Sequence, residues 1–366
     1  MKRRIATGGG GASHCMADGL ILSIDGMGGD NAPDIVVEGV EIAARKWPDA
    51  RFLLHGDEAA LRALIDRHPA AARVCEVRAA ERAIGMEVKA SQALRQGKGS
   101  SLWNAVEAVK EGQAHAVVSA GNTGAFMAIS MFRLRTMQGV HRPALTASMP
   151  SLRGRVVVMD VGANVEADAE QLVEFAIMGE AFYRALYGVE RPSVGLLNVG
   201  SEDQKGHEEI RAAAKLIRER GIDIGFHGFV EGDDIGKGTV NVVVTDGFTG
   251  NIALKAIEGT ARLVGSFLRE TLTSGVLARL GALCAYPALQ KLRARMDPST
   301  NNGAVFLGLS GVAVKSHGSA TAAGFAVAID VAVRLAQSHY REEVARNIAR
   351  LGAAEPDARA AQQDAS

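Results

Sequence analysis

The sequence predicts an α/β protein with a largely parallel sheet that is covered by helices on both faces. Short apolar, β-branched runs alternate with longer helical segments from residue 20 to residue 338, as in strands that are joined by crossover helices. The 366 residues, of which 47 % are apolar, can bury a large core. No apolar run approaches the ~20 residues of a membrane span, so an integral membrane protein is excluded. The 41 basic and 41 acidic residues leave no net charge, which argues against nucleic acid as the main partner.

The first half of the chain alternates in this way four times. Residues 20–24 form an apolar run, and a helix over 32–46 follows because Pro33 suits a first helical turn and apolar residues recur on one face. Further apolar runs predict strands over 51–54, 74–77 and 116–119. Helical spacing predicts helices over 58–67, 102–110 and 125–137.

The second half repeats the pattern. Strands are predicted over 156–159, 193–198, 224–226, 240–244, 304–307 and 312–315. Helices are predicted over 170–187, 207–220, 251–271 and 320–338. Residues 20–352 are expected to form one domain, in which two lobes sharing a sheet would not be visible in the sequence. Residues 1–19 and 353–366 are expected to be disordered tails, since both are polar or rich in small residues.

Cysteine usage indicates the compartment. Cys15, Cys75 and Cys284 are odd in number and far apart, so they predict neither a disulfide framework nor a zinc site. The basic N-terminus has no apolar segment behind it, so no leader peptide is expected. These features predict a cytoplasmic protein with no bound metal.

Six predicted strands end in loops that combine glycine with small polar residues. These loops begin at Asp25, Ala120, Asp160, Asn198, Thr245 and Ser316. Because ligands bind at the carboxyl ends of parallel strands, the six loops are expected on the same side of one sheet. Glycine allows close approach of the backbone, and N–H groups at helix starts bind anions. Any one of these loops is also typical of a turn or helix cap, but six together favour a polar active cleft.

Known motifs do not fit this cleft. The dinucleotide fingerprint fails after Gly26 and Gly28, because Asn31 stands where the third glycine belongs. The P-loop pattern before Gly97-Lys98 fails because Gln92 replaces its first glycine. The chain has neither a G-x-S-x-G elbow nor an H-x-x-x-H metal pair. A reaction in which the bound anion is itself the nucleophile needs no catalytic serine or cysteine.

The loops resemble the motifs of the phosphate acyltransferase family (acyl-acyl carrier protein:phosphate acyltransferases). D-G-M-G-G-D-N-A-P from Asp25 is similar to its opening D-A-M-G-G-D-x-A-P, with glycine in place of alanine at Gly26. The later motifs appear in the family's order: S-A-G-N-T-G-A from Ser119, D-V-G-A-N from Asp160, G-L-L-N-V-G from Gly195 with Lys205-Gly206, D-G-F-T-G-N from Asp246 and H-G-S from His317. The resemblance covers nearly all of residues 20–338.

The resemblance implies a fold, an activity and partners. The fold would be a three-layer α/β/α arrangement like that of isocitrate dehydrogenases and phosphotransacetylases, in a homodimer. The enzyme would transfer a long-chain acyl group from acyl carrier protein to inorganic phosphate, with no cofactor. The acyl phosphate would pass to a glycerol-3-phosphate acyltransferase in bacterial phospholipid synthesis. The alternatives are a phosphotransacetylase that uses a short acyl-coenzyme A, and a non-catalytic phosphometabolite-binding protein.

Site roles follow from this resemblance as hypotheses. Phosphate is expected in a cradle of Asn122, Thr123 and Gly124, with Lys205 as a mobile cation. His317 is expected to donate to the oxyanion or to protonate the leaving thiolate, although it could instead fix its loop. Asn164 and Asn251 complete the predicted catalytic set.

The remaining predicted substrate-binding residues come from the same loops. They are Gly28, Gly29, Asn31, Asp160, Asp246 and Gly318. Carboxylates repel phosphate, so at least two of Asp25, Asp30, Asp160 and Asp246 are expected to cap helices or orient donors rather than to touch the anion.

Residues 262–297 form a basic amphipathic segment. It carries six basic and two acidic residues among apolar residues at helical spacing, a pattern typical of membrane surfaces or acidic partners. Peripheral contact with a membrane, docking of the acidic carrier protein and a dimer interface remain open. The predicted docking residues are Arg279, Leu280, Leu283, Lys291 and Arg293.

Overall fold

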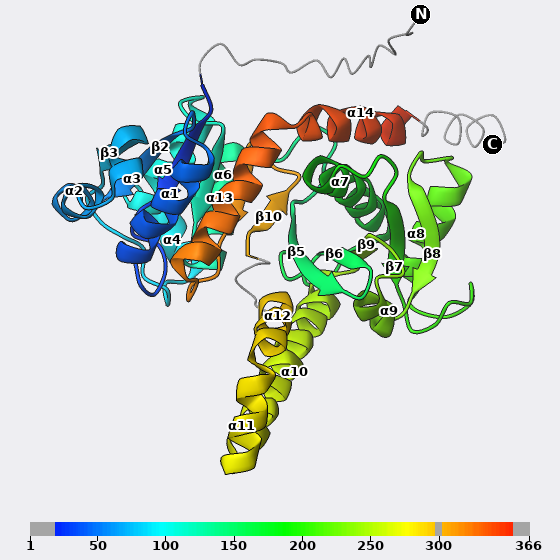
Figure 1. Cartoon of the computed structure of the whole chain (residues 1–366). Coiled ribbons are helices and arrows are strands. Elements are labelled where there is room, and N and C mark those ends of the chain that lie inside the picture. The colour runs from blue at the N-terminus through cyan, green and yellow to red at the C-terminus, as the bar shows by residue number, and fades with distance from the viewer. Residues whose placement is uncertain (1–18, 297–301, 354–366) are drawn as a thin grey trace, which may run out of the picture.

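The chain folds around a single eleven-stranded sheet with helices on both faces (Figure 1). The computed structural model describes residues 19–296 and 302–353. The two predicted tails therefore lie almost wholly outside the described residues. The strand order is β3-β2-β1-β4-β11-β10-β5-β6-β9-β7-β8.

The sheet has two parallel parts. The first contains β3 (Cys75–Ala79), β2 (Arg51–Gly56), β1 (Ile21–Asp25), β4 (Ala116–Ser119) and β11 (Val312–Lys315). The second contains β6 (Gly154–Met159), β9 (Val242–Val244), β7 (Ser193–Leu197) and β8 (Gly225–Val230). Between them lie β10 (Ala304–Leu307) and β5 (Ala144–Ser151), whose pairings with their neighbours are all antiparallel.

These antiparallel pairings reverse the direction of the second part. The chain direction changes between β11 and β10, again between β10 and β5, and again between β5 and β6. The strands β6, β9 and β7 therefore run in the opposite direction to β1, β4 and β11. Their carboxyl ends point to the opposite side of the sheet. The prediction that six strand-end loops share one side is thus wrong, because it assumed a sheet without this reversal.

The two sets of strand ends nevertheless flank one cross-strand row. Register aligns Ile24, Val118, Val314, Val305, Thr146, Met159, Val244 and Leu196 across the sheet. Asp25 follows this row by one residue in one strand direction, and Asp160 follows it by one residue in the opposite direction. Both sets of loops therefore lie near the same level of the sheet.

Two helical layers bury the two faces of the sheet, which confirms the three-layer α/β/α prediction. One core cluster combines one face with α1 (Asp34–Lys46), α2 (Glu58–Ile65), α3 (Pro69–Val74), α7 (Ala169–Tyr187), α8 (Glu208–Glu219), α13 (Ala322–Gln337) and α14 (Tyr340–Ala353). The other face packs on α4 (Ala90–Gln96), α5 (Ser101–Lys110), α6 (Thr123–Leu134), α9 (Gly232–Lys237) and the start of α10 (Gly247–Thr273). Helices α1 and α13 pack closely because Gly39 has no side chain where a Cβ would lie 2.9 Å from Phe325.

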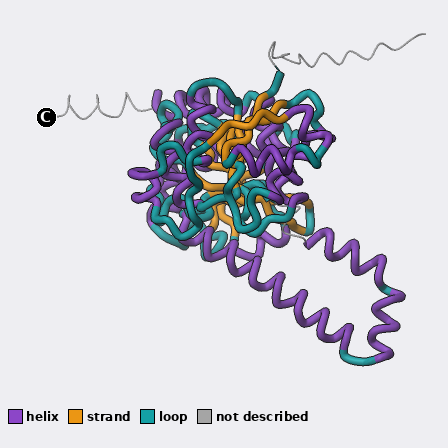
Figure 2. Tube along the Cα trace, turned by 90° about the vertical axis from the view of Figure 1, so that its left-hand side faces the viewer, coloured by secondary structure: helices purple, strands orange, loops and turns teal. Residues whose placement is uncertain are grey.

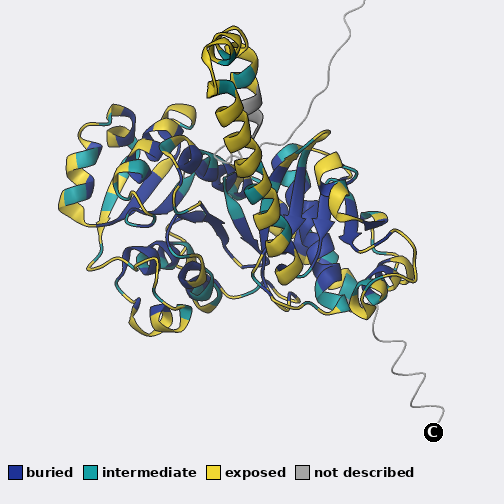
Figure 3. Cartoon of the chain, turned by 90° about the horizontal axis from the view of Figure 1, so that it is seen from below, coloured by how far each residue is buried: buried dark blue, intermediate teal, exposed yellow. Residues whose placement is uncertain are grey.

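Helices α10, α11 (Val276–Cys284) and α12 (Tyr286–Met296) form an arm that projects from the body (Figures 1 and 2). Nearly all of the arm is exposed in Figure 3. The apolar residues Val276, Leu277 and Leu283 are 76 %, 86 % and 71 % exposed. Among residues 19–296 and 302–353, no helix combines the length and the apolar character that crossing a membrane requires.

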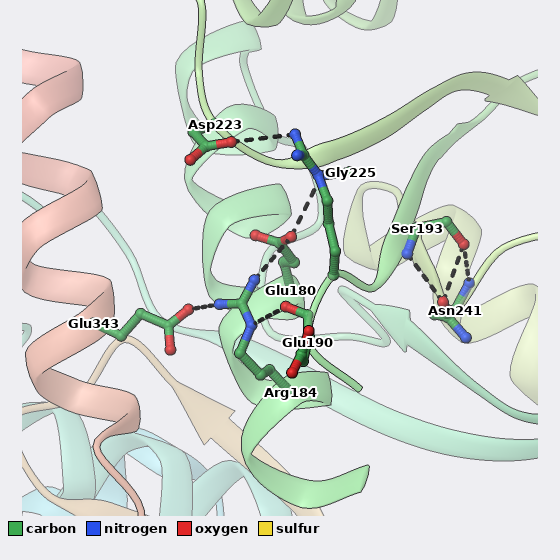
Figure 4. A network of polar contacts seen from close by, with 9 residues as sticks. Glu180, Arg184, Glu190, Ser193, Asp223, Gly225, Asn241 and Glu343 are labelled. Carbon is green, nitrogen blue, oxygen red and sulfur yellow. Dashed lines mark hydrogen bonds and ion pairs between the residues drawn. The ribbon is translucent and has the colours of Figure 1, made fainter. Parts of the chain in front are cut away.

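A buried polar network joins α7 to its surroundings (Figure 4). The Glu180 side chain is 1 % exposed, and its Oε1 lies 3.1 Å from Arg184 Nη2 and accepts a 3.3 Å hydrogen bond from Gly225 N. Arg184 also donates to the Glu190 carbonyl and pairs with Glu343 on α14. Arg184 therefore ties α7 both to α14 and to the loop that precedes β7.

Replacing Arg184 with alanine is expected to lower the free energy of unfolding by about 2 kcal/mol, because it leaves the buried Glu180 carboxylate without its cation. Arginine 184 is partly exposed, so the effect should be smaller than for a fully buried pair. Urea denaturation measures the change. The matched control is Arg191→Ala, which removes an exposed pair with Asp223 and should cost less than about 1 kcal/mol. Equal losses in the two variants would contradict this assignment.

Candidate active site

Two loop clusters carry the polar residues that the sequence points to. The first loop cluster comprises residues 25–33, 119–124 and 315–320, which follow β1, β4 and β11. The second loop cluster comprises residues 160–164, 198–206 and 245–251, which follow β6, β7 and β9.

The first loop cluster rests on three buried polar residues of adjacent strands. Asp25, Ser119 and Lys315 lie in one cross-strand row, since Lys315 pairs with Ser119 and the neighbouring residues Ile24 and Val118 pair with each other. They are 2 %, 0 % and 7 % exposed. Ser119 Oγ donates to Asp25 Oδ2 at 2.7 Å and accepts from Gly121 N at 3.0 Å. Burial raises the pKa of the Asp25 carboxyl, against hydrogen bonds and the charge of Lys315, which lower it.

The backbone of the β1 loop lies directly over this row because of Gly28. A Cβ at Gly28 would lie 2.4 Å from Asp25 Oδ2 and 2.7 Å from Gly121 N. No other residue type fits there without moving the loops apart. The neighbouring Gly29 has a φ of +109°, a conformation open to glycine, and Asp30 N then donates to the Gly318 carbonyl at 2.9 Å. Gly28 thus brings the β1 loop against the β4 loop, and Gly29 and Gly318 bring it against the β11 loop.

Helix α6 begins in this cluster. Its N-cap is Asn122, whose Oδ1 accepts from Ala125 N at 3.0 Å and whose Nδ2 donates to the carbonyls of Met86 and Val88. The Asn122 side chain is therefore occupied by the protein, and its predicted contact with phosphate would have to use the backbone. Thr123 and Gly124 are exposed in the first turn, where main-chain N–H groups and the helix dipole favour an anion.

The structure adds Lys315, which the sequence analysis did not single out. Its Nζ donates to the carbonyls of Ala120, at 3.3 Å, and Ser316. Burial lowers the pKa of Lys315 to about 8, although the charges of Asp25 and Asp30 act to raise it. The only signal in the sequence was that a lysine ends an otherwise apolar strand, two residues before His317-Gly318-Ser319.

His317 and Ser319 form an exposed pair at the rim of the first loop cluster. His317 Nδ1 accepts from Ser319 N at 3.2 Å and lies 2.9 Å from Ser319 Oγ. Asn302 Oδ1 accepts from His317 N at 2.9 Å. The ring is therefore oriented by its own loop, and its Nε2 can face a ligand. Asn31 is exposed in the neighbouring β1 loop.

The second loop cluster is organised by Asp160. This carboxylate is fully buried, and its oxygens accept five hydrogen bonds, from the backbone N–H groups of Leu145, Gly162, Ala163 and Asn164 and from Asn164 Nδ2. Asn164 Nδ2 also donates to the Pro143 carbonyl at 2.8 Å. Asp160 and Asn164 therefore shape the loop from inside, rather than presenting their donors and acceptors to solvent.

Asp246 caps α10 in the same cluster. Its Oδ1 accepts from Thr249 N at 2.8 Å, and its Oδ2 accepts from Thr249 Oγ1 at 2.8 Å. Asn251 is exposed in the next turn, facing the Gly162 backbone. Asp160 and Asp246 thus orient and cap, as expected of at least two of the four aspartates, and their contact with substrate stays a prediction.

Lys205 lies in the second loop cluster, over Gly200. It is exposed and pairs with Glu202 at 2.8 Å, which raises the pKa of the Lys205 ammonium. Asn198 fixes this loop by donating to the Lys205 carbonyl at 3.0 Å.

Lys205 belongs to the second loop cluster, and the cradle of Asn122, Thr123 and Gly124 belongs to the first. Six strand steps separate β4 from β7 in the sheet order. The pairing of Lys205 with phosphate in that cradle stays a prediction. Within the first loop cluster, the cation is Lys315.

Two nucleophile candidates outside the loop clusters, Ser23 and Cys75, are buried and half-buried. Ser23 Oγ lies 3.0 Å from His55 Nε2, but both residues are at least 95 % buried, and burial lowers the pKa of His55 to about 4. Burial also raises the pKa of the Cys75 thiol to about 12, which leaves it unreactive. Neither group can attack a substrate in this fold.

The fold and the first loop cluster together define an α/β/α protein in which an exposed helix start lies next to a buried lysine. Solved structures with this architecture include a phosphotransacetylase from Streptococcus pyogenes (TM-score 0.58, 16 % identity, covering 87 % of this chain and 94 % of that one). A second is the EutD phosphotransacetylase from Staphylococcus aureus (TM-score 0.55, 16 % identity, the same coverage). The fold is therefore phosphotransacetylase-like.

Sequence comparison gives the family. The family model described as "Fatty acid synthesis protein" matches residues 20–343. The "Phosphate acyltransferase" of Caulobacter vibrioides is 59 % identical over 92 % of this chain and 94 % of its own length. That of Rhizobium meliloti is 51 % identical over 92 % and 97 %. The chain belongs to this family, the phosphate acyltransferases.

Proposed function

We propose that the protein transfers a long-chain fatty acyl group from acyl-acyl carrier protein to inorganic phosphate, giving acyl phosphate for bacterial phospholipid synthesis. The observation that carries this proposal is the first loop cluster, where the exposed start of α6 adjoins the buried Lys315 in a chain 59 % identical to a phosphate acyltransferase. Such a site suits a dianion.

In the proposed reaction, phosphate is the nucleophile. A phosphate oxygen attacks the thioester carbonyl carbon, the carbon–sulfur bond breaks, and the proton of the hydrogen phosphate passes to the leaving thiolate. His317, with an oriented ring at the rim, would donate to the oxyanion or deliver that proton. Asn251 and Lys205, which are exposed in the second loop cluster, would contact the acyl donor. Asp160 and Asn164 would hold that loop in place.

The fold likeness supports a second candidate, a phosphotransacetylase that uses short acyl-coenzyme A. Trapping acyl phosphate with hydroxylamine separates the two. Palmitoyl-acyl carrier protein with phosphate should give a hydroxamate, and acetyl-coenzyme A should give none. Turnover with acetyl-coenzyme A alone would establish the second candidate, and turnover with neither donor would favour a non-catalytic phosphometabolite-binding protein.

We propose that the protein is a cytoplasmic homodimer whose arm touches a membrane surface. The tip of the arm exposes Leu277, Leu280 and Leu283 beside Arg279, an arrangement that suits the boundary between headgroups and acyl chains. Lys291 is exposed on α12, and the side chain of Arg293 lies outside the described part. Such contact would let the acyl phosphate pass to a membrane-bound glycerol-3-phosphate acyltransferase.

The double variant Leu280→Glu/Leu283→Glu is expected to lose most flotation with anionic liposomes, because two carboxylates would enter the apolar boundary. Gel filtration reports whether the dimer remains, and the KM for acyl carrier protein reports carrier docking. Unchanged flotation would contradict the membrane role. A raised KM with normal flotation would assign the arm to the carrier, and dissociation into monomers would assign it to the dimer interface.

A further inference from the structure

Lys315 is buried, and the charges of Asp25 and Asp30 act on its ammonium from nearby. Among the ion pairs of the described residues none contains Lys315, and its Nζ is hydrogen-bonded only to the carbonyls of Ala120 and Ser316. An ammonium has three N–H donors, so one donor has no acceptor in the described part of the chain. The charges of Asp25 and Asp30 offset only part of the cost of burying this ammonium, since its pKa is still lowered, and an anion from outside would accept from the remaining donor.

The position of Lys315 indicates where an anion from outside would bind. Its Nζ is bonded to Ala120, two residues before the N-cap of α6. Thr123 and Gly124 therefore begin the helix on the segment that Lys315 holds. The carbonyl of Ser316 fixes the same ammonium to the loop that carries His317 and Gly318. An anion at the start of α6 would meet both the helix dipole and this ammonium.

We propose that Lys315 supplies the positive charge of the anion site and positions the two loops that form it. This role rests on the proposed function, because the anion it would serve in turnover is phosphate. The same chemistry is offered by inorganic phosphate and by the phosphodiester of a carrier protein's prosthetic arm. Lys315 should be read as a binding and positioning residue, since the contacts that hold it are to the backbone.

The ammonium gives this role a pH signature. The pKa of Lys315 is lowered to about 8, so its charge is present below that pH and is lost above it. The titratable groups that act on it are Asp25 from β1 and Asp30 from the β1 loop. Lys205 does not share the signature, because Glu202 raises the pKa of Lys205.

Sulfate tests the proposal without turnover, because its charge is constant from pH 6.5 to pH 9.5. Its affinity for the full-length enzyme, measured by calorimetry, should fall above pH ~8 by up to tenfold per pH unit. In Lys315→Met, affinity at pH 7 should be about 30-fold weaker and should change little up to pH 9.5. In Lys315→Arg, which stays charged, the fall above pH 8 should disappear. Circular dichroism checks that the variants are folded, and if the methionine variant does not fold, the arginine variant decides.

Kinetics then identify the source of the anion. Lys315→Met should raise the KM for phosphate about 30-fold and leave the KM for the acyl donor unchanged. A raised KM for the donor alone would assign Lys315 to the carrier's phosphodiester. Wild-type affinity for sulfate in Lys315→Met, or an equal fall with pH in Lys315→Arg, would overturn the role of Lys315 while the proposed function stands. If the wild type turned over acyl donor without any affinity for sulfate or phosphate at this site, both the role and the proposed phosphate site would be wrong.

Discussion

Gly28→Ala is expected to reduce kcat/KM for phosphate about 100-fold. The added methyl would lie 2.4 Å from Asp25 Oδ2 and 2.7 Å from Gly121 N, so the β1 loop must move away from the β4 loop. A displacement of about 1 Å at a site that holds reacting groups can cost two orders of magnitude. Steady-state kinetics with varied phosphate measure the loss.

The control for this variant is Gly236→Ala. Gly236 lies in α9, and a Cβ there would have no neighbour within 4 Å, so activity should not change. Thermal unfolding of both variants separates a displaced loop from a general loss of stability. Wild-type activity in Gly28→Ala would show that close contact between the two loops is not required.

Asp160→Asn is expected to lower the free energy of unfolding by about 3 kcal/mol. The carboxylate accepts five hydrogen bonds in a fully buried position. An amide of the same shape would place an NH₂ group against N–H donors, and the loss of charge would weaken the bonds that remain. Chemical denaturation measures the difference.

Asp203→Asn is the matched control for this second variant. Asp203 pairs with Arg218 on the surface, where both side chains are more than half exposed, and its loss should cost less than about 1 kcal/mol. If Asp160→Asn were as stable as the control variant, the second loop cluster would not depend on the buried carboxylate.

Most of the helices and strands could be predicted from the sequence, because apolar runs and helical spacing report burial directly. Strands β4, β10 and β11 have the predicted bounds. Strand β5 was not predicted, since Ala144–Ser151 contains Pro150 and few β-branched residues. It pairs antiparallel with β10, which is distant in the sequence, and with β6, to which a hairpin joins it. Local patterns carry no information about strand direction. Because neither β5 nor the direction of β10 was predicted, all six loops were expected on one side of the sheet.

The residues of the candidate site could be predicted from the sequence better than their arrangement in space. Glycine motifs located both loop clusters, because close backbone approach leaves a visible signature at residues such as Gly28. They could not show that the Asn122 side chain donates to the carbonyls of Met86 and Val88. Nor could they show that Lys315, on an otherwise apolar strand, is buried and donates to the Ala120 carbonyl. Those facts depend on which segments meet in space.

The central claim is that phosphate attacks the thioester directly, and exchange of labelled carrier protein tests it. The first loop cluster contains one exposed hydroxyl beside a histidine, Ser319 with His317, which is where a covalent acyl-enzyme would form. In the absence of phosphate, labelled free carrier protein incubated with enzyme and unlabelled acyl-acyl carrier protein should not enter the acylated pool. Exchange without phosphate that disappears in Ser319→Ala would contradict the account, because it would reveal an acyl-serine intermediate.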